Sequence, residues 1–200
     1  MPETSDRFAA AMAAIDAANA ADPNQETVDG GTRPAAILYS ERMSAWLDRL
    51  DPNASEPLKL AARAQHIERW TIPRDSYPMD RPGYLKWRTD LGKFHADRAG
   101  AIMADAGYDD EAVERTKALI RKRRLKKDPE TQRLEDVICL VFLENYFADF
   151  SKQHDEAKIV SILQKTWKKM SPDGHAAALD LVGKLPDDAR AIVEKALKDA

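Results

Sequence analysis

The sequence is poor in the residues and runs that mark several large classes of protein. It has 1 cysteine, Cys139, which excludes an internal disulfide and a zinc site built from several cysteines. Its 8 glycines form no glycine-rich phosphate loop. No apolar run reaches the roughly 18 residues that span a bilayer, and early acidic residues argue against a signal peptide. We therefore expect a cytoplasmic protein with no membrane partner.

Charge and standard catalytic motifs leave the class of function open. The chain has 34 acidic and 31 basic residues, for a net charge of −3, which favours neither nucleic acid nor an acidic partner. Neither the HExxH motif of zinc proteases nor the GxSxG motif of serine hydrolases is present. Any function must be argued from local clusters of residues.

Apolar residues recur with the period of a helix nearly throughout, which predicts an all-α fold. The segment 21–34 is predicted to be a loop and 35–50 a helix. Three prolines exclude a continuous helix over 71–88, and helical period returns from Asp90 to Ala106. We expect one helical domain over residues 1–150, followed by a helical C-terminal extension, 151–200, that packs on it.

The segment Leu58–Arg74, LKLAARAQHIERWTIPR, is predicted to be a helix that carries a single histidine, His66. On a helical wheel His66 lies opposite the core stripe, whose members are Leu60, Ala61, Ala64 and Ile67. Such a histidine is either solvated or part of a second contact surface. Arg63, Arg69 and Trp70 lie three or four residues from it on the same face.

Two further polar residues are predicted to point inward. His95 shares a helix face with Leu91 and Ile102, and Arg98 borders that face. The two side chains form either a satisfied polar pair in the core or the wall of a site. Asp136 opens the most apolar helix of the chain. It either favours the helix N-terminus by its charge or lies deep enough to need a partner.

Arginines alternate with aromatic residues after the His66 segment. Guanidinium groups bind phosphates through two parallel hydrogen bonds, and aromatic rings stack on bases or on arginine. This pattern favours a site for an anionic small molecule or a nucleotide, against the alternative of a loop that its aromatics hold in place. The expected ligand contacts are Arg63, Arg69, Arg74, Arg81, Arg88, Arg98, Trp70, Tyr77, Tyr84 and Trp87.

The strongest charge run, Arg115–Lys127, holds eight basic residues. It is either an RNA-binding segment or a solvated helix end, where cations are favoured by the helix dipole.

The segments LYSERMSAWL, LAARAQHIERWTIPRDSYP, GYLKWR, FHA and LEDVICLVFLENY together resemble a family of unknown function whose members are sometimes labelled glutamyl-tRNA synthetase. The resemblance spans most of the chain to about Phe150. It implies no established activity, and the chain has no nucleotide-binding signature that would support the synthetase label.

A more distant resemblance is to HD-type metal phosphohydrolases, which are all-helical. LAARAQHI is similar to their His-Asp helix, although the pair here is Gln65-His66 or His66-Ile67. The resemblance implies an HD-like bundle with His66, His95 and Asp136 as catalytic residues. It also implies a divalent metal held by Glu41 and the same three residues, since nitrogen and carboxylate ligands suit such ions.

Two functions follow from these patterns. One is a divergent hydrolase of a phosphorylated small molecule or nucleotide. The other is a protein without catalytic activity that binds RNA, a nucleotide or another protein through the same residues.

Overall fold

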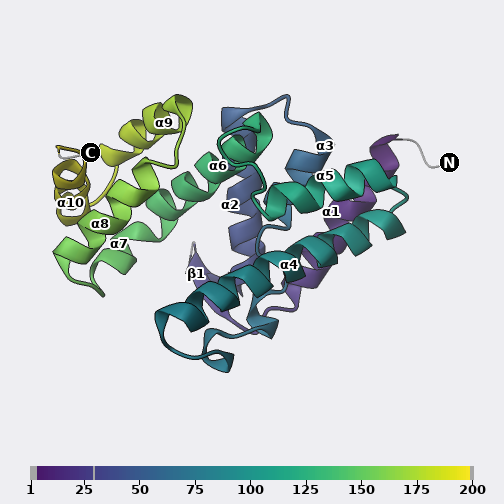
Figure 1. Ribbon diagram of the computed structural model, residues 1–200, viewed down its shortest axis with the longest axis horizontal. Coiled ribbons are helices and arrows are strands. Elements are labelled where there is room, and N and C mark those ends of the chain that lie inside the picture. Colours follow the sequence, from purple (N-terminus) through teal and green to yellow (C-terminus); the bar gives the residue numbers. More distant parts are fainter. Residues whose placement is uncertain (1–3, 29, 199–200) are drawn as a thin grey trace. The chain divides into compact units, whose positions relative to one another are not determined.

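The computed structural model describes residues 4–28 and 30–198, and the chain divides into two compact units, residues 1–124 and 125–200. Both units are built of helices, and the one sheet within the described ranges has two short strands (Figure 1). The all-α class predicted from the sequence is therefore confirmed. The HD-like arrangement and a domain boundary at residue 150 stay predictions.

The first unit contains α1 (Thr4–Ala20), α2 (Ala35–Leu50), α3 (Glu56–Arg63), α4 (Arg81–Asp105) and α5 (Asp110–Ile120). α5 packs along α4 and against α3, while α1 contacts α2, α3 and α4 (Figure 1). The core lies where these helices meet, and Met43, Leu58 and Leu119 are completely buried there. The apolar face predicted for residues 35–50 accounts for α2, whose bounds agree with the prediction.

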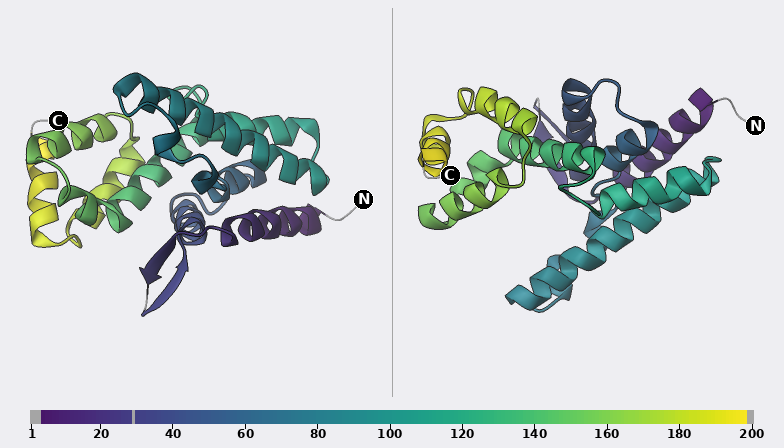
Figure 2. Two further views of the ribbon diagram at one scale, coloured as in Figure 1. Left: turned by 90° about the horizontal axis from the view of Figure 1, so that it is seen from below. Right: turned by 45° about the horizontal axis from the view of Figure 1, so that its top comes forward.

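A β-hairpin replaces the loop predicted for residues 21–34. β1 (Gln25–Val28) pairs antiparallel with β2 (Gly31–Pro34), with Gln25 opposite Pro34, and the strands project from the helices of their unit (Figure 2). The sequence does carry a hairpin signal, because the pair DG at 29–30 is typical of two-residue turns. Gly30 has the positive φ, 77°, that such turns require.

The helix predicted over Leu58–Arg74 is correct only as far as Arg63, where α3 ends. Glu68 adopts left-handed backbone angles, with φ of 50°. Its amide donates to Asn19 Oδ1 at 3.2 Å, and its carboxylate pairs with Arg98 at 2.8 Å. Two short 3-10 helices follow, η1 (Arg69–Thr71) and η2 (Arg74–Ser76). His66 therefore lies in a turn, and the helical-wheel argument that placed it opposite the core was wrong.

α4 begins at Arg81, well before the predicted start at Asp90. Asp80 caps it, because its Oδ1 accepts a hydrogen bond from the Gly83 amide at 2.7 Å, and Pro82 occupies the first turn. The preceding loop lies directly against this turn. A Cβ atom built on Gly83 would be 2.1 Å from the carbonyl oxygen of Pro78. This early start places four more aromatic or cationic residues of the predicted site on α4: Arg81, Tyr84, Trp87 and Arg88.

The second unit contains α6 (Pro129–Asn145), α7 (Phe147–Ser151), α8 (Glu156–Trp167), α9 (Pro172–Val182) and α10 (Asp187–Lys198). α9 packs on α6, and α10 packs on α8 (Figure 1). The start signals SPDG and LPDD correspond to the first turns of α9 and α10. Across the described parts of both units, no helix is long and apolar enough to cross a membrane.

Candidate functional site

His66 and His95 come together in the first unit, although the turn that carries His66 and the helix α4 that carries His95 are distant in the sequence. Their ring centroids are 5.9 Å apart. The ring of Tyr39, on α2, stacks on His66 with centroids 4.2 Å apart and planes at 16°. His66 is half-buried and His95 is buried, which confirms the inward direction predicted for His95. The residues predicted for the site from the sequence did not include Tyr39.

The orientation of the His95 ring is fixed by one hydrogen bond. Its Nδ1 lies 2.7 Å from the carbonyl oxygen of Ile67, and a carbonyl can only accept, so Nδ1 carries the proton. In the neutral ring Nε2 then carries a lone pair. Within residues 4–28 and 30–198 this buried nitrogen has no hydrogen-bond partner. Burial lowers the pKa of His95 to about 4, so the ring is neutral near pH 7.

Arg69 brings a positive charge to the same place from η1. Its guanidinium lies over the ring of Trp87, 4.7 Å from the centroid. Burial lowers the pKa of Arg69, but a guanidinium keeps its proton at any physiological pH. In the described part of the chain no carboxylate forms an ion pair with Arg69. Arg69 is half-buried, and a partly desolvated charge without a counter-ion favours a bound anion.

Arg74 and Arg88 extend the positive region over the next aromatic ring. The guanidinium carbons of both lie 5.9 Å from the ring centroid of Tyr84. Arg74 also donates to the carbonyl oxygens of Tyr77 and Pro78, at 3.1 and 2.7 Å, so it fixes the loop before α4. Among the residues described, neither arginine has a carboxylate partner. We call His66, Arg69, Arg74, Arg88 and His95 the arginine–histidine cluster.

The side chains that lower the pKa of His66 are arginines, a lysine and the second histidine. This pKa lies well below the ordinary value, first because of burial and then because of Arg69 and His95, with weaker contributions from Lys122 and Arg88. The imidazole is therefore neutral near pH 7 in a positive environment. A bound anion would reverse this effect and raise the pKa of His66.

The other arginines predicted for the site are distributed differently. Arg63 forms two hydrogen bonds with the carboxylate of Asp16, at 2.6 and 2.8 Å, and Arg98 pairs with Glu68. Both charges are thus neutralised within the chain. Arg81 is exposed in the first turn of α4. The sequence could not distinguish paired from unpaired arginines, because the carboxylate partners lie 47 and 30 positions away.

The aromatic residues predicted for the site hold the loop and line the cluster. Trp87 is buried, and its indole N–H donates to the carbonyl of Ile72 at 2.9 Å. The Tyr77 hydroxyl donates to Asp90 at 2.9 Å, and Trp70 is half-buried in η1. Tyr84, 41% exposed, is the aromatic ring of the cluster that is open to a ligand.

One stripe of α4 carries much of this cluster. Its residues recur at intervals of three and four, and they are Tyr84, Trp87, Arg88, Leu91 and His95. The sequence contained the signal that would have revealed this stripe, because Asp80 followed by Pro82 is typical of a helix start. A predicted start at Asp90 left the first half of the stripe in a loop.

Of the four residues of the predicted metal site, Glu41, His66 and His95 lie in the first unit and Asp136 lies in the second. The Glu41 carboxylate accepts two hydrogen bonds from Arg33, at 3.0 and 2.7 Å. Within the described ranges no group of three or more histidine, cysteine, aspartate or glutamate residues could hold a metal ion. The metal site stays a prediction, and the function proposed below uses no metal.

Asp136 is buried in the second unit and has a clear structural role there. Its Oδ1 accepts from the Ser171 amide at 2.9 Å and from Gln132 at 3.1 Å, and its Oδ2 accepts from the Ser171 hydroxyl at 2.5 Å. Ser171 in turn caps α9 through the amide of Gly174. Asp136 therefore fastens the start of α9 to α6, which is the partner that the sequence argument required for a buried carboxylate.

A comparison with known protein families identifies one family to which the sequence is similar. The chain matches the model described as a domain of unknown function, DUF4202, over residues 9–193. The chain belongs to the DUF4202 family. No curated protein and no solved structure matches it. The resemblance to a family of unknown function is confirmed, and because DUF4202 membership implies no activity, a function must be argued from the residues themselves.

The basic run Arg115–Lys127 of this DUF4202 domain is partly engaged by the chain itself. Arg121 pairs with Asp97 at 2.6 Å, and Lys117 pairs with Glu114 at 2.6 Å. Lys126 donates to two carbonyl oxygens after α8, those of Lys168 and Lys169. These contacts reduce the charge available to RNA, and RNA binding stays a prediction.

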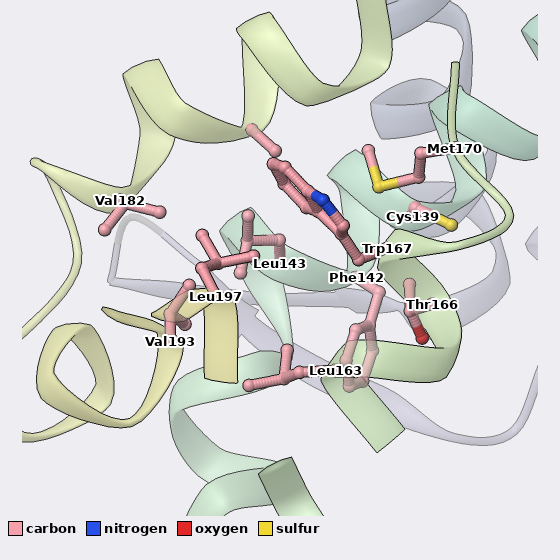
Figure 3. Close-up of a pocket in the computed structure, with 11 residues that line it drawn as sticks. Cys139, Phe142, Leu143, Leu163, Thr166, Trp167, Met170, Val182, Val193 and Leu197 are labelled. Atoms are coloured by element: carbon pink, nitrogen blue, oxygen red, sulfur yellow. The ribbon is translucent and has the colours of Figure 1, made fainter. Parts of the chain in front are cut away.

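The second unit of the DUF4202 domain encloses a small apolar cavity of about 30 Å³ (Figure 3). Trp167, Phe142, Leu163 and Leu197 are among the residues that line it (Figure 3). The cavity is too small for a drug-sized or metabolite-sized ligand, which needs several hundred Å³. It is therefore a packing defect of the helical core and contributes no binding site.

Proposed function

We propose that this protein binds a phosphorylated small molecule or nucleotide at the arginine–histidine cluster. The observation that carries the proposal is the set of three arginines, Arg69, Arg74 and Arg88, that lack carboxylate partners in the described chain while Arg63 and Arg98 have them. Guanidinium forks match the oxygens of a phosphate, and this match is stronger where water is partly excluded.

The aromatic rings support a ligand with a flat or apolar part beside its phosphate. Tyr84 is 41% exposed, and Met79 and Leu85 beside it are 75% and 54% exposed. Stacking of a nucleobase on an aromatic side chain contributes about 1–3 kcal/mol. A nucleotide would place its phosphate at Arg69 and Arg88 and its base at Tyr84.

Hydrolysis of the bound ester is a second candidate function, and the neutral state of His66 favours it. A neutral imidazole beside a bound phosphate can accept a proton from an attacking water. Arg69 and Arg88 would then stabilise the negative charge of the transition state. The substrate class would then be that of the HD-type phosphohydrolases, but the reaction would use no metal.

Titration calorimetry with a panel of nucleotides and sugar phosphates tests binding. Arg69→Gln should weaken phosphate binding by roughly 10- to 100-fold, the range expected for a hydrogen bond to a charged group. Arg49→Gln is the matched control, because its guanidinium also lies over a tryptophan ring, Trp46, at 4.8 Å. Equal affinities of the two variants would refute the proposal, as would a lack of binding across the panel.

Release of inorganic phosphate from the same panel separates the two candidates. Phosphate release that His66→Gln abolishes while binding persists would establish a hydrolase. Tight binding without turnover would establish a binding protein. The cytoplasmic location expected from the single cysteine stays a prediction, and Cys139 is buried.

A further inference from the structure

The acceptor on His95 is chemically different from the three guanidinium groups of the arginine–histidine cluster. Arg69, Arg74 and Arg88 can only donate hydrogen bonds. The Nε2 atom of His95 can only accept one, because the Ile67 carbonyl holds the ring proton on Nδ1. His95 is 2% exposed, and its Nε2 has no partner within the described residues. A buried acceptor without a donor is a rare and costly feature.

The neighbours of His95 do not supply the missing donor. The ring of His66 is 5.9 Å away between centroids, and the ring of Phe94 makes an edge contact at 5.7 Å. The guanidinium of Arg69 is close enough to lower the pKa of His95, yet it forms no hydrogen bond to the ring in the described chain. The donor must therefore come from outside the described chain, as an ordered water or as a ligand.

We propose that the ligand carries a hydroxyl group close to its phosphate, and that this hydroxyl donates a hydrogen bond to Nε2 of His95. The inference rests on the proposed function, since the arginines must first hold the phosphate. It narrows the substrate class to hydroxylated phosphate esters: polyol phosphates, sugar phosphates and ribonucleotides. A phosphate ester without a hydroxyl would leave Nε2 unpaired and would bind more weakly.

An ionised phosphate oxygen, the form that predominates above the second phosphate pKa of about 6, cannot replace the hydroxyl at His95. An ionised oxygen has no proton to donate, so it would repel the lone pair of Nε2. Protonation of His95 would reverse this, but Arg69 and the burial of the ring both oppose a positive charge there. The arginines and His95 therefore divide the ligand between them, with anionic oxygens at the arginines and a neutral hydroxyl at the histidine.

Two substitutions separate the acceptor from the ring's structural role. In His95→Asn the amide nitrogen takes the place of Nδ1 and can still donate to Ile67, but nothing takes the place of Nε2. In His95→Gln the side-chain oxygen reaches the position of Nε2 and can accept. Loss of one buried hydrogen bond lowers affinity by about tenfold.

The experiment compares probe pairs that differ by hydroxyl groups, by titration calorimetry on the full chain. The pairs are glycerol 3-phosphate with propyl phosphate, and adenosine 5′-monophosphate with its 2′,3′-dideoxy form. The wild type should prefer the hydroxylated member of at least one pair by about tenfold. His95→Asn should reduce this preference to within twofold, and His95→Gln should retain part of it. The pair that shows the preference identifies the source of the hydroxyl.

Several results would overturn the inference. If the wild type binds both members of each pair equally, the proposed function remains, but the proposed hydrogen bond from a ligand hydroxyl to His95 is refuted. No binding of any probe would refute both. If the variants do not fold, the ¹⁵N chemical shift of Nε2 in the wild type tests the inference instead. When the hydroxylated probe is added, this shift should move toward the value of a hydrogen-bonded, unprotonated nitrogen. A shift to the value of a protonated nitrogen at pH 7.5 would contradict the inference.

Discussion

Replacement of Gly83 by alanine tests whether the loop before α4 and the helix itself form one rigid site. The new Cβ would lie 2.1 Å from the carbonyl oxygen of Pro78 and 2.8 Å from its carbonyl carbon. Contact distances of real Cβ atoms exceed 3.0 Å, so the loop must move by about 1 Å. That loop carries Arg74, whose guanidinium donates to the Pro78 carbonyl. The substitution therefore displaces one arginine of the cluster relative to α4.

The matched control is Gly92→Ala in the same helix, where no atom lies within 4 Å of the new Cβ. Alanine is favoured over glycine inside a helix by about 1 kcal/mol, so Gly92→Ala should stabilise the unit by up to that amount. Overpacking at Gly83 should cost about 1–3 kcal/mol. The two variants should thus differ by roughly 2–4 kcal/mol in the free energy of unfolding.

Urea unfolding in a Trp167→Phe background measures this difference, because the tryptophans that remain all lie in the first unit. Calorimetry with ribose 5-phosphate measures the effect on the site. Gly83→Ala should weaken binding by about tenfold, as expected when one hydrogen bond to a charged group is lost, and Gly92→Ala should change it less than twofold. If both variants unfold and bind alike, the close contact between loop and helix does not position Arg74.

Three further predictions follow from buried groups. Because the folded-state pKa of His95 is about 4 and the unfolded value is 6.5, the stability that neutral His95 contributes is complete above pH 6.5 and is lost as the pH falls to 4, by about 3 kcal/mol. An NMR titration of the ring checks the pKa, and His95→Asn should unfold with a shallower pH dependence. Gly174→Ala should destabilise the second unit by about 1–3 kcal/mol, because its Cβ would lie 2.7 Å from the Asp136 carboxylate. Gly183→Ala is the control, because no atom lies within 4 Å of its Cβ, and thermal melts of the two variants make the comparison. Asp136→Ala should lower the free energy of unfolding of the second unit by about 2–4 kcal/mol in chemical denaturation and leave phosphate binding unchanged, since its bonds go to Ser171 and Gln132.

Local chemistry predicted most helices of this protein well. The helix 35–50 follows from its apolar period, and the start of α9 follows from Ser171 and Pro172, because capping depends on residues three positions apart. The end of α3 does not follow from local chemistry. Glu68 is held in a left-handed conformation by Asn19 and Arg98, which are distant in the sequence. A helix that long-range contacts interrupt leaves no signal in its own residues.

Some features of the candidate site also follow from neighbouring residues, and others depend on contacts that are distant in the sequence. Residue types were predictable, since arginines beside aromatic rings indicate an anion site from the sequence alone. Which arginines keep a positive charge for a ligand could not be predicted from the sequence. Asp16 and Glu68 neutralise Arg63 and Arg98, and these pairings arise only when the helices pack. The stacking of Tyr39 on His66 likewise depends on how α2 meets the turn after α3.

The stripe on α4 fixes the orientation in which the proposed ligand would bind. Exposure rises along it from 2% at His95 to 8% at Trp87 and 41% at Tyr84. Arg69 lies over Trp87, so the phosphate is held between the buried and the exposed ends of the stripe. A hydroxyl bound to His95 must then enter first. Esters of a short chain that carry a hydroxyl close to the phosphate, as ribose 5-phosphate does, fit this order directly. We therefore expect sugar phosphates to bind more tightly than nucleotides, unless stacking on Tyr84 contributes more than the hydrogen bond to His95.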